Sequence, residues 1–491
     1  MNSATAAQAG LVALQARIQH DLACLGLPAK TWVPTLQRDG QHVNDVVIVG
    51  AGMAGLTLAA SLTHLGIRPH VLDRAPAGFE GPWATTARME TLRSPKELTG
   101  PALGIPSLTF RAWYEAQFGA EGWSRLDKIP RLQWAEYLRW YRQVLGLVVH
   151  NQQHLVQVAP RPDGVVELHV ADGSAGQQHR LLARHVVLAT GRDGLGGPWV
   201  PQWSGTLPRE RWVHSGESWD GERLRGLRVA VIGAGASAMD AAATALEHGA
   251  ERVDVLIRRQ QLPRINKSKG SGNPGMAHGY WALPDEWKWR IRHYINQEQV
   301  PPPRGSTLRV SRHANAHFHF GAGVQAASLR ADQALCLHTA KGPLVADFVI
   351  FCTGFRTDWS VRPEFALIAP QIRVWKDRFA TPEGQDDAEL ADSPDLGPLF
   401  EFQPKVPGQC PGLERIHCFN YAGALSQGAG AGDIPQISDG AQRLARGLVT
   451  RMLSEDVAYH FEALQRYDDP ELLGDEWHEA EFPIYDNPKI T

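Results

Sequence analysis

Short apolar runs along this chain are followed by glycine-rich turns and then by alanine-rich segments of helical periodicity. Val46-Val47-Ile48-Val49 precedes Gly50-Ala51-Gly52-Met53-Ala54-Gly55, which we call the first fingerprint. Val229-Ala230-Val231-Ile232 precedes Gly233-Ala234-Gly235-Ala236-Ser237-Ala238, the second fingerprint. Each pattern predicts a buried strand, a tight turn and a helix.

Further elements are predicted around these two units. Leu11, Leu14, Ile18, Leu22 and Leu25 recur at helical spacing and predict an amphipathic N-terminal helix that docks on the body of the protein. The rest of the pattern predicts helical structure within 83–147, alternating strands within 155–170, a strand over 185–191, a long loop over 267–303 with a short helix at 286–295, a strand over 347–355 and a helix over 435–452.

These elements predict an α/β protein with two Rossmann-like dinucleotide-binding domains, one inserted in the other. We expect an N-terminal helical extension at 1–40 and a first nucleotide domain formed by 41–205 and 331–455, with a helical insertion at about 84–150. The second nucleotide domain is expected at 206–330 and an acidic tail at 456–491. A chain of 491 residues is too long for one ordinary core, which favours several domains.

The glycine fingerprints predict phosphate binding. The first glycine permits the tight bend, and the second lets the backbone approach a pyrophosphate at the positive end of the following helix. One such loop binds one dinucleotide, so two fingerprints predict two.

The residues after each fingerprint predict different nucleotides. Asp73 follows Gly50 by 23 residues, near the usual spacing for an acid that holds a ribose diol, which favours FAD or NAD. The strand after the second fingerprint ends in Arg258-Arg259, and guanidinium groups suit the 2′-phosphate of NADPH. A basic pair at a strand end is also typical of a solvated surface.

The composition and charge of the chain exclude some classes of binding partner. The formal net charge is -3, which indicates neither a nucleic-acid-binding surface nor an anionic membrane, so we expect a small-molecule partner. The five cysteines are scattered without a CxxC pair, which argues against a zinc ribbon or a redox-active dithiol and suits a reducing cytoplasm. We expect no metal and no membrane span, and the composition is compatible with a homo-oligomer.

Several ordered motifs resemble those of the class B flavoprotein monooxygenases, which comprise flavin-containing, Baeyer–Villiger and N-hydroxylating monooxygenases. The resemblance covers roughly residues 45–455. It implies FAD at the first fingerprint and NADPH at the second. The implied FAD contacts are Gly50, Gly52, Met53, Ala54, Gly55, Asp73, Arg74 and Gly191, and the implied NADPH contacts are Gly233, Gly235, Ala236, Ser237, Asp240, Arg258 and Arg259.

Shorter segments extend the resemblance. Gly81-Pro82-Trp83 resembles a Gly-Gly-x-Trp segment beside the flavin, and Thr353-Gly354-Phe355 resembles a signature near the interdomain hinge. His214 and Trp219 resemble the end of an FxGxxxHxxxW motif, although here they stand one residue further apart. We expect His214 to act as an interdomain latch.

Arg93-Ser94-Pro95-Lys96-Glu97 resembles an Asn-x-Ser-Lys-Glu segment whose asparagine contacts the reactive edge of the flavin, with Arg93 in the place of that asparagine. Arg93 and Lys96 are therefore candidates to stabilise an oxygen adduct or an anionic substrate group. A surface cation or a contact to the FAD phosphates is the other interpretation of Arg93. Asp433 and the helix from Pro435 are expected near the flavin ring.

The resemblance implies an FAD-dependent, NADPH-consuming monooxygenase that places one atom of O2 in a small substrate through a C4a-(hydro)peroxyflavin. N-hydroxylation of an amine or amino acid is an alternative, in which Lys96, Lys267 and Lys269 recruit a carboxylate. An NADPH-dependent flavoprotein reductase is a second alternative, which the lack of a CxxC pair disfavours. A nucleotide-sensing protein without catalysis is a third.

Overall fold

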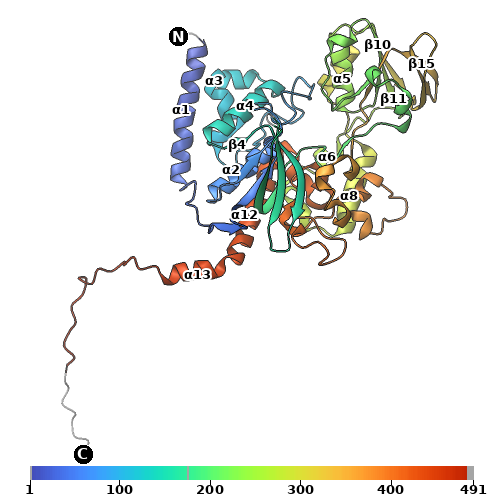
Figure 1. Cartoon of the computed structure of the whole chain (residues 1–491). Helices are drawn as coiled ribbons and strands as arrows, with labels where there is room; N and C mark the ends of the chain where they lie inside the picture. Colours follow the sequence, from blue (N-terminus) through green and yellow to red (C-terminus); the bar gives the residue numbers. More distant parts are fainter. Residues whose placement is uncertain (1–2, 174–175, 484–491) are drawn as a thin grey trace, which may run out of the picture.

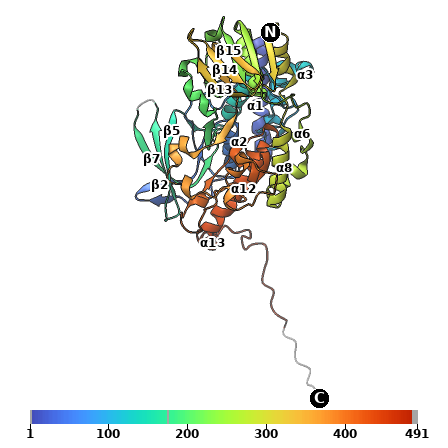
Figure 2. The same ribbon diagram turned by 90° about the vertical axis from the view of Figure 1, so that its right-hand side faces the viewer.

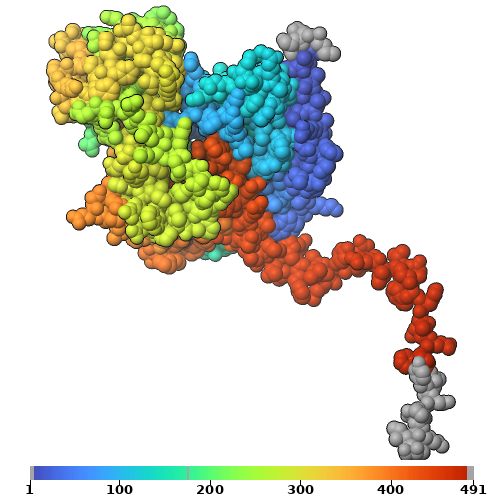
Figure 3. Space-filling model, turned by 180° about the vertical axis from the view of Figure 1, so that it is seen from behind, coloured from blue at the N-terminus to red at the C-terminus, as the bar shows by residue number. Residues whose placement is uncertain are grey.

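Two α/β units of unequal size form the protein, and the computed structural model describes residues 3–173 and 176–483 (Figure 1). The larger unit carries the first fingerprint and the smaller one the second. Figure 3 shows the smaller unit (green to yellow, upper left) and the segment around residues 110–144 (cyan) on two sides of a hollow.

The sheet of the larger unit has the order β4-β3-β2-β7-β6-β5. Its strands are β2 (Gln41–Val49), β3 (His70–Leu72), β4 (Val149–His150), β5 (Gln153–Pro160), β6 (Val166–Asp172) and β7 (Gln178–Leu188), with β1 (Leu36–Arg38) beside β2 and β18 (Ile416–His417) beside β7. The pairs among β4, β3, β2 and β7 are parallel, and β5 and β6 extend the sheet as an antiparallel hairpin. The four parallel strands therefore end at one edge, where the first fingerprint lies.

Helices cover this sheet. α2 (Met53–His64) follows the first fingerprint and packs against α12 (Ile437–Glu455), and Leu58 and Leu444 are fully buried. The helix expected over 435–452 is thus confirmed, with Pro435 in the turn that precedes it. α13 (Val457–Gln465) follows, and the chain is exposed from there to residue 483; the last residues of the expected acidic tail, 484–491, lie outside the described residues.

The expected helical segment consists of α3 (Phe110–Arg125) and α4 (Arg131–Val144), which pack through aromatic rings such as those of Phe110, Trp134 and Tyr137. The N-terminal helix α1 (Ser3–Cys24) docks on α3, as its periodicity predicted. A Cβ at Gly10 would lie 1.8 Å from the carbonyl oxygen of Ala116, so the two helices approach as closely as glycine allows.

The smaller unit contains a parallel sheet of order β12-β11-β10-β16-β9. Its strands are β9 (Trp212–His214), β10 (Arg228–Ile232), β11 (Arg252–Ile257), β12 (Ala316–Phe320) and β16 (Phe348–Phe351). α5 (Ala236–Glu247) and α9 (Arg304–Ser311) pack together, and the antiparallel strands β13 (Val324–Leu329), β14 (Leu335–Thr339) and β15 (Gly342–Ala346) form a separate layer. β16 pairs with β10, so this sheet also uses residues beyond the 206–330 interval.

Within the interval 206–330, the helices of residues 267–298 pack on the larger unit. α8 (Asp285–Glu298) contacts the helices Ala388–Ala391 and Ala424–Gln427, α7 (Pro274–Gly279) contacts the turn at 428–431, and α6 (Lys267–Gly270) contacts α8. Figure 2 shows α6 and α8 on the side of the molecule that carries α12. Trp289 of α8 is buried with Trp375 and Leu425, and Phe379 packs against both tryptophans. The expected helix at 286–295 is present, but the larger unit and not the second nucleotide domain buries its tryptophan. None of the described helices has the length and apolar character needed to span a membrane.

Candidate active site

The first fingerprint shows two different uses of glycine. Gly50 has a φ of 103°, and a Cβ there would lie 2.5 Å from the carbonyl oxygen of Ala189. A Cβ at Gly55 would lie 1.8 Å from the carbonyl oxygen of Gly50. At Gly52 the nearest atom to an added Cβ is the Cα of Gly81, at 3.7 Å. The fold therefore explains Gly50 and Gly55, whereas the space beside Gly52 is open at the position where the second glycine of such a loop lets the backbone approach a pyrophosphate, and we call it a cradle.

Asp73 lies at the end of β3, beside this cradle. Its carboxylate accepts hydrogen bonds from the backbone N–H groups of Ala51 (2.6 Å) and Ala75 (2.7 Å). Burial raises the pKa of Asp73, and the two backbone hydrogen bonds oppose that shift. Each oxygen keeps lone-pair capacity for a ribose hydroxyl, so the residue fits the predicted ribose contact. Arg74, the next residue, is exposed.

The other predicted FAD contacts lie around the same edge. Met53 and Ala54 begin α2. The carbonyl of Trp83 accepts a hydrogen bond from Arg131. Gly191, with a φ of 81°, follows β7, and its carbonyl accepts from the backbone N–H of Tyr421 at 3.4 Å. Asp433 is exposed in the turn before α12.

The second fingerprint shows the same two uses of glycine as the first. A Cβ at Gly233 would lie 2.5 Å from the carbonyl oxygen of Cys352, while a Cβ at Gly235 would meet nothing within 4 Å. α5 begins at Ala236, and Ser237 is exposed in its first turn. This loop also leaves open space beside the N-terminus of a helix, where a phosphate is favourable.

The two arginines after β11 differ in their surroundings. Arg259 donates a hydrogen bond to the carbonyl of Gln297 in α8 at 2.9 Å. Arg258 is exposed and has no hydrogen-bond or ion-pair partner within the part of the chain that the structure describes. Arg258 therefore keeps its guanidinium available for a 2′-phosphate, and Arg259 ties β11 to α8.

Asp240 lies on α5, just after the second fingerprint, and its expected NADPH contact stays a prediction. It lies 4% exposed on the face of α5 that packs against α9, where Nη1 of Arg309 is 3.6 Å from its carboxylate. Burial raises the pKa of Asp240, and the Arg309 charge opposes that shift. This placement gives Asp240 an ion-pair role between two helices.

Lys96 lies in a turn, and its side chain reaches the C-terminal end of α3. Its ammonium donates hydrogen bonds to the carbonyls of Trp123 (2.8 Å) and Leu126 (2.6 Å) at the C-terminus of α3. The Trp123 carbonyl also accepts the backbone N–H of Leu126 at 3.2 Å, and a cation is favourable at this end of the helix because of the helix dipole. The structure thus assigns Lys96 to capping α3, which does not support the expected contact with an oxygen adduct.

Arg93 joins the two units. Its guanidinium donates to the carbonyl of Pro301, in the linker between α8 and α9, at 2.6 Å. Burial lowers the pKa of Arg93, the Asp240 charge raises it and the Arg192 charge lowers it again. Arg93 therefore lies within electrostatic range of Asp240 on α5 and of Arg192 after β7.

His214 ends β9 in the sheet of the smaller unit, and its expected role as an interdomain latch stays a prediction. It is fully buried, its Nδ1 accepts from the N–H of Gly216 at 3.0 Å, and its ring lies edge-on to Phe355 at 5.3 Å. Burial lowers the pKa of His214, so the ring is neutral near pH 7. Gly354 and Thr353 of the hinge are hydrogen-bonded to the backbone of Trp199.

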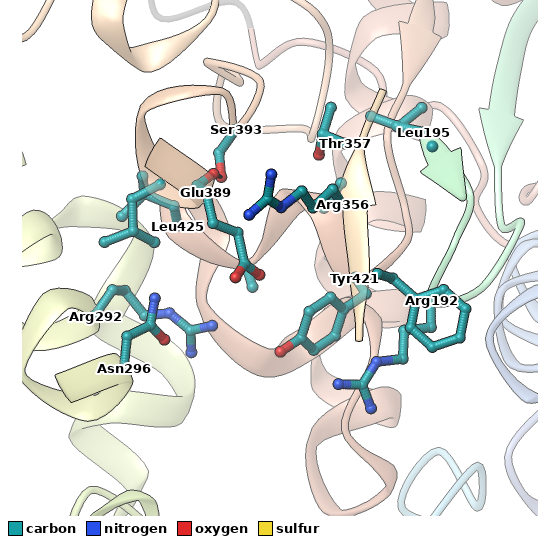
Figure 4. Close-up of a pocket in the computed structure, with 15 residues that line it drawn as sticks. Arg192, Leu195, Arg292, Asn296, Arg356, Thr357, Glu389, Ser393, Tyr421 and Leu425 are labelled. Atoms are coloured by element: carbon teal, nitrogen blue, oxygen red, sulfur yellow. Dashed lines mark hydrogen bonds between the residues drawn. The ribbon is translucent and has the colours of Figure 1, made fainter. Parts of the chain in front are cut away.

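Sequence reasoning missed two features. One is a contact between Arg88 of the larger unit and Trp219 of the smaller one, with the guanidinium 3.5 Å from the ring centroid. The other is a pocket lined by Arg192, Arg292, Arg356 and Glu389 (Figure 4). Trp219 had a motif signal, but the other residues come from separate segments that no local pattern connects.

Two family models match the chain: L-lysine 6-monooxygenase/L-ornithine 5-monooxygenase over residues 123–300, and FAD-NAD(P)-binding over residues 47–193. A FAD-dependent urate hydroxylase of Xanthomonas campestris pv. campestris is 39% identical over 471 residues, which cover 94% of this chain and 98% of that protein. The indole-3-pyruvate monooxygenase YUCCA1 of Oryza sativa subsp. japonica is 28% identical over 231 residues, 44% of this chain and 49% of that protein.

Solved structures show the same fold. The ornithine N-hydroxylase KtzI of Kutzneria sp. 744, with reduced FAD, NADP+ and L-ornithine, matches with a TM-score of 0.65 at 17% identity and covers 83% of this chain and 99% of that one. The FAD-bound cadaverine monooxygenase DfoA of Erwinia amylovora matches with a TM-score of 0.61 at 16% identity, covering 90% and 100%. At this identity the likeness establishes the fold alone.

Proposed function

Because the chain belongs to the FAD-dependent monooxygenase family of the urate hydroxylase that it matches along nearly its whole length, we propose that it hydroxylates urate or a closely related oxidised purine. The reaction consumes one NADPH, one O2 and one proton per substrate. One oxygen atom enters the purine, the other leaves as water, and NADP+ is released.

The observation that carries the proposal is the pair of open cradles at Gly52 and Gly235, one in each unit. Two dinucleotides fit there, and FAD reduced by NADPH supplies the chemistry that activates O2. We infer that Gly52 and Asp73 hold the pyrophosphate and ribose of FAD, while Gly235, Ser237 and Arg258 hold the phosphates of NADPH. Gly50, Gly55, Gly233 and Thr353-Gly354 shape these loops and the hinge between them.

The protein contributes orientation and exclusion of water. The contact of Arg88 with Trp219 holds the two units together, and we call the hollow between them in Figure 3 the cleft. Arg93 also binds the 299–303 linker. A closed cleft keeps water from the reduced cofactor, which favours transfer of oxygen to the substrate over release of hydrogen peroxide. We place the enzyme in the cytoplasm, because its five cysteines are free thiols.

The test is turnover of urate by the purified holoenzyme with NADPH under 18O2. We expect urate to stimulate NADPH consumption and to gain one labelled oxygen, while lysine, ornithine and cadaverine do neither. A hydroxylated amine would instead support the N-hydroxylation alternative that the match over residues 123–300 raises. NADPH consumption with no oxygenated product from any of these compounds would support a reductase.

A further inference from the structure

The pocket of Figure 4 lies beside the predicted flavin site. It forms where the segment after β7 meets α8, β17 (Phe355–Thr357), α10 (Ala388–Ala391) and α11 (Ala424–Gln427). Arg192 directly follows Gly191, and Tyr421 is hydrogen-bonded through its backbone to Gly191. The pocket therefore adjoins the strand edge that carries the first fingerprint.

Its walls carry more positive than negative charge. Arg292, Arg356 and Arg192 come from three separate segments and line the pocket with a single carboxylate, Glu389. Figure 4 shows the Glu389 carboxylate and the guanidiniums of Arg292 and Arg356 directed into the same space. Glu389 forms no ion pair with these arginines among the described residues. The pocket thus holds an excess of cationic charge.

Two further observations indicate that a ligand completes this cluster. Nε of Arg292 is buried and has no hydrogen-bond partner within the described ranges, and such an atom is costly to leave unpaired. By contrast, the buried Arg184 pairs with both Glu455 and Asp456. The carboxylate of the neighbouring Asp387 is already engaged by Asn296 and by the backbone of Glu389.

Aromatic rings orient the cations and add an apolar surface. The Arg192 guanidinium lies 5.1 Å from the ring centroid of Tyr421 and 5.6 Å from that of Phe355, and that of Arg356 lies 4.3 Å from the ring of Trp199. Tyr421 is 40% exposed. A flat ligand has both charged and aromatic partners here.

We propose that this pocket binds the organic substrate as a planar, anionic oxopurine, with its oxygens on Arg292 and Arg356, a ring N–H on Glu389 and its face near Tyr421. The inference rests on the proposed function and names the residues that select the substrate. Guanidinium forks match adjacent acceptor oxygens, and a carboxylate accepts a ring N–H. The cationic surroundings disfavour an aliphatic diamine, which carries two positive charges at neutral pH.

The experiment measures equilibrium binding of urate to the oxidised holoenzyme by calorimetry, without NADPH. We expect Arg292→Gln and Arg356→Gln each to weaken urate binding and to raise KM for urate about 10-fold or more, as loss of a charge-assisted hydrogen bond implies. Glu389→Gln is a conservative change in the same pocket, and it should weaken urate binding less than either arginine substitution. Anaerobic reduction of the flavin by NADPH should stay unchanged in all three.

Arg290→Gln is the matched control, because Arg290 lies on the same helix, is exposed and packs over Trp287 outside the pocket. FAD content and circular dichroism check that each variant folds.

Wild-type affinity for urate in both arginine variants would overturn the inference while leaving the proposed function intact. If the wild type neither binds nor oxidises urate, but binds the anionic pyrimidine orotate with the same dependence on Arg292 and Arg356, the proposed function fails and an anionic heterocycle pocket stands. Binding of neither probe would overturn both.

Discussion

The guanidinium of Arg88 lies 3.5 Å above the ring of Trp219 and donates a hydrogen bond to the Trp219 carbonyl at 2.5 Å. Arg88 belongs to the larger unit and Trp219 to the smaller one. Burial lowers the pKa of Arg88 to about 10, which still leaves it charged at neutral pH. Arg309 of the smaller unit also donates to the Arg88 carbonyl at 3.3 Å. This contact therefore fixes how the two nucleotide-binding units face each other.

Arg88→Gln should uncouple the reaction. A buried cation–π contact contributes about 2 kcal/mol, so its loss favours a more open cleft and admits water. We expect more hydrogen peroxide and less oxygenated product per NADPH, measured by peroxide assay and product analysis. Arg209→Gln is the control, because Arg209 lies 4.0 Å from the ring of Trp212 within the smaller unit. Equal coupling in Arg88→Gln and the wild type would contradict this role.

Gly52→Ala and Gly235→Ala should separate cofactor binding from folding. Neither Cβ would meet a protein atom closer than 3.7 Å, so both variants should fold. A methyl group in each cradle should displace one dinucleotide: Gly52→Ala should lower FAD content, and Gly235→Ala should raise KM for NADPH at normal FAD content. Bound FAD is measured by absorbance after purification.

Gly205→Ala and Gly305→Ala provide the comparison, because an added Cβ meets nothing within 4 Å at either position and neither lies in a fingerprint. Both should retain full FAD content and ordinary NADPH kinetics. Full FAD occupancy in Gly52→Ala would show that the pyrophosphate does not lie at this loop.

Arg258→Ala should reduce the preference for NADPH over NADH. Loss of a charge-assisted contact to the 2′-phosphate costs about 1.5–3 kcal/mol, which corresponds to roughly 10- to 100-fold in kcat/KM. NADH lacks that phosphate and should be used as before. Arg259→Ala should affect the two nucleotides equally, because Arg259 is bound to the Gln297 carbonyl. An equal effect of Arg258→Ala on both would exclude it as the 2′-phosphate contact.

The sequence predicted features that local spacing determines. Gly50, Asp73 and Gly233 were identified because a strand, a turn and a helix impose a fixed order on them, and the structure places them at the carboxyl edges of the two sheets. Lys96 could not be interpreted in this way, because its partners are carbonyls at residues 123–126, about one helix further along the chain. The arginine pocket likewise depends on tertiary packing: Trp289 draws α8 onto the larger unit and so brings Arg292 beside Arg356.

Lys96→Met should destabilise the protein without altering oxygen transfer. The ammonium binds carbonyls at the C-terminus of α3, and its loss should cost about 1–2 kcal/mol, which lowers the thermal midpoint of a chain of this length by about 1–2 °C. Peroxide yield and kcat should match the wild type. Lys341→Met, at an exposed turn, should leave the midpoint unchanged. A changed peroxide yield with an unchanged midpoint would restore the catalytic interpretation of Lys96.

The buried pair His185 and His417 should make the stability of the larger unit depend on pH. Nδ1 of His417 donates to the Leu399 carbonyl at 2.7 Å, so its Nε2 accepts the proton that Nδ1 of His185 presents at 3.1 Å. Burial lowers the pKa of His417 to about 3 and that of His185 well below its usual range, so both rings are neutral in the folded protein. Unfolded histidines take up protons below about pH 6.5. The stability that the neutral pair contributes is therefore fully present above that pH, and it falls by about 1.4 kcal/mol per pH unit for each histidine as the pH drops toward 3.

His185→Asn tests this dependence, because it keeps a donor at the Nδ1 position and removes one titrating ring. The unfolding free energy, measured by urea denaturation, should then fall less steeply between about pH 6.5 and 5, by up to about 1.4 kcal/mol per pH unit. The exposed His338→Asn should leave that fall unchanged, and an unaltered pH dependence in His185→Asn would show that His185 is not neutral in the native state.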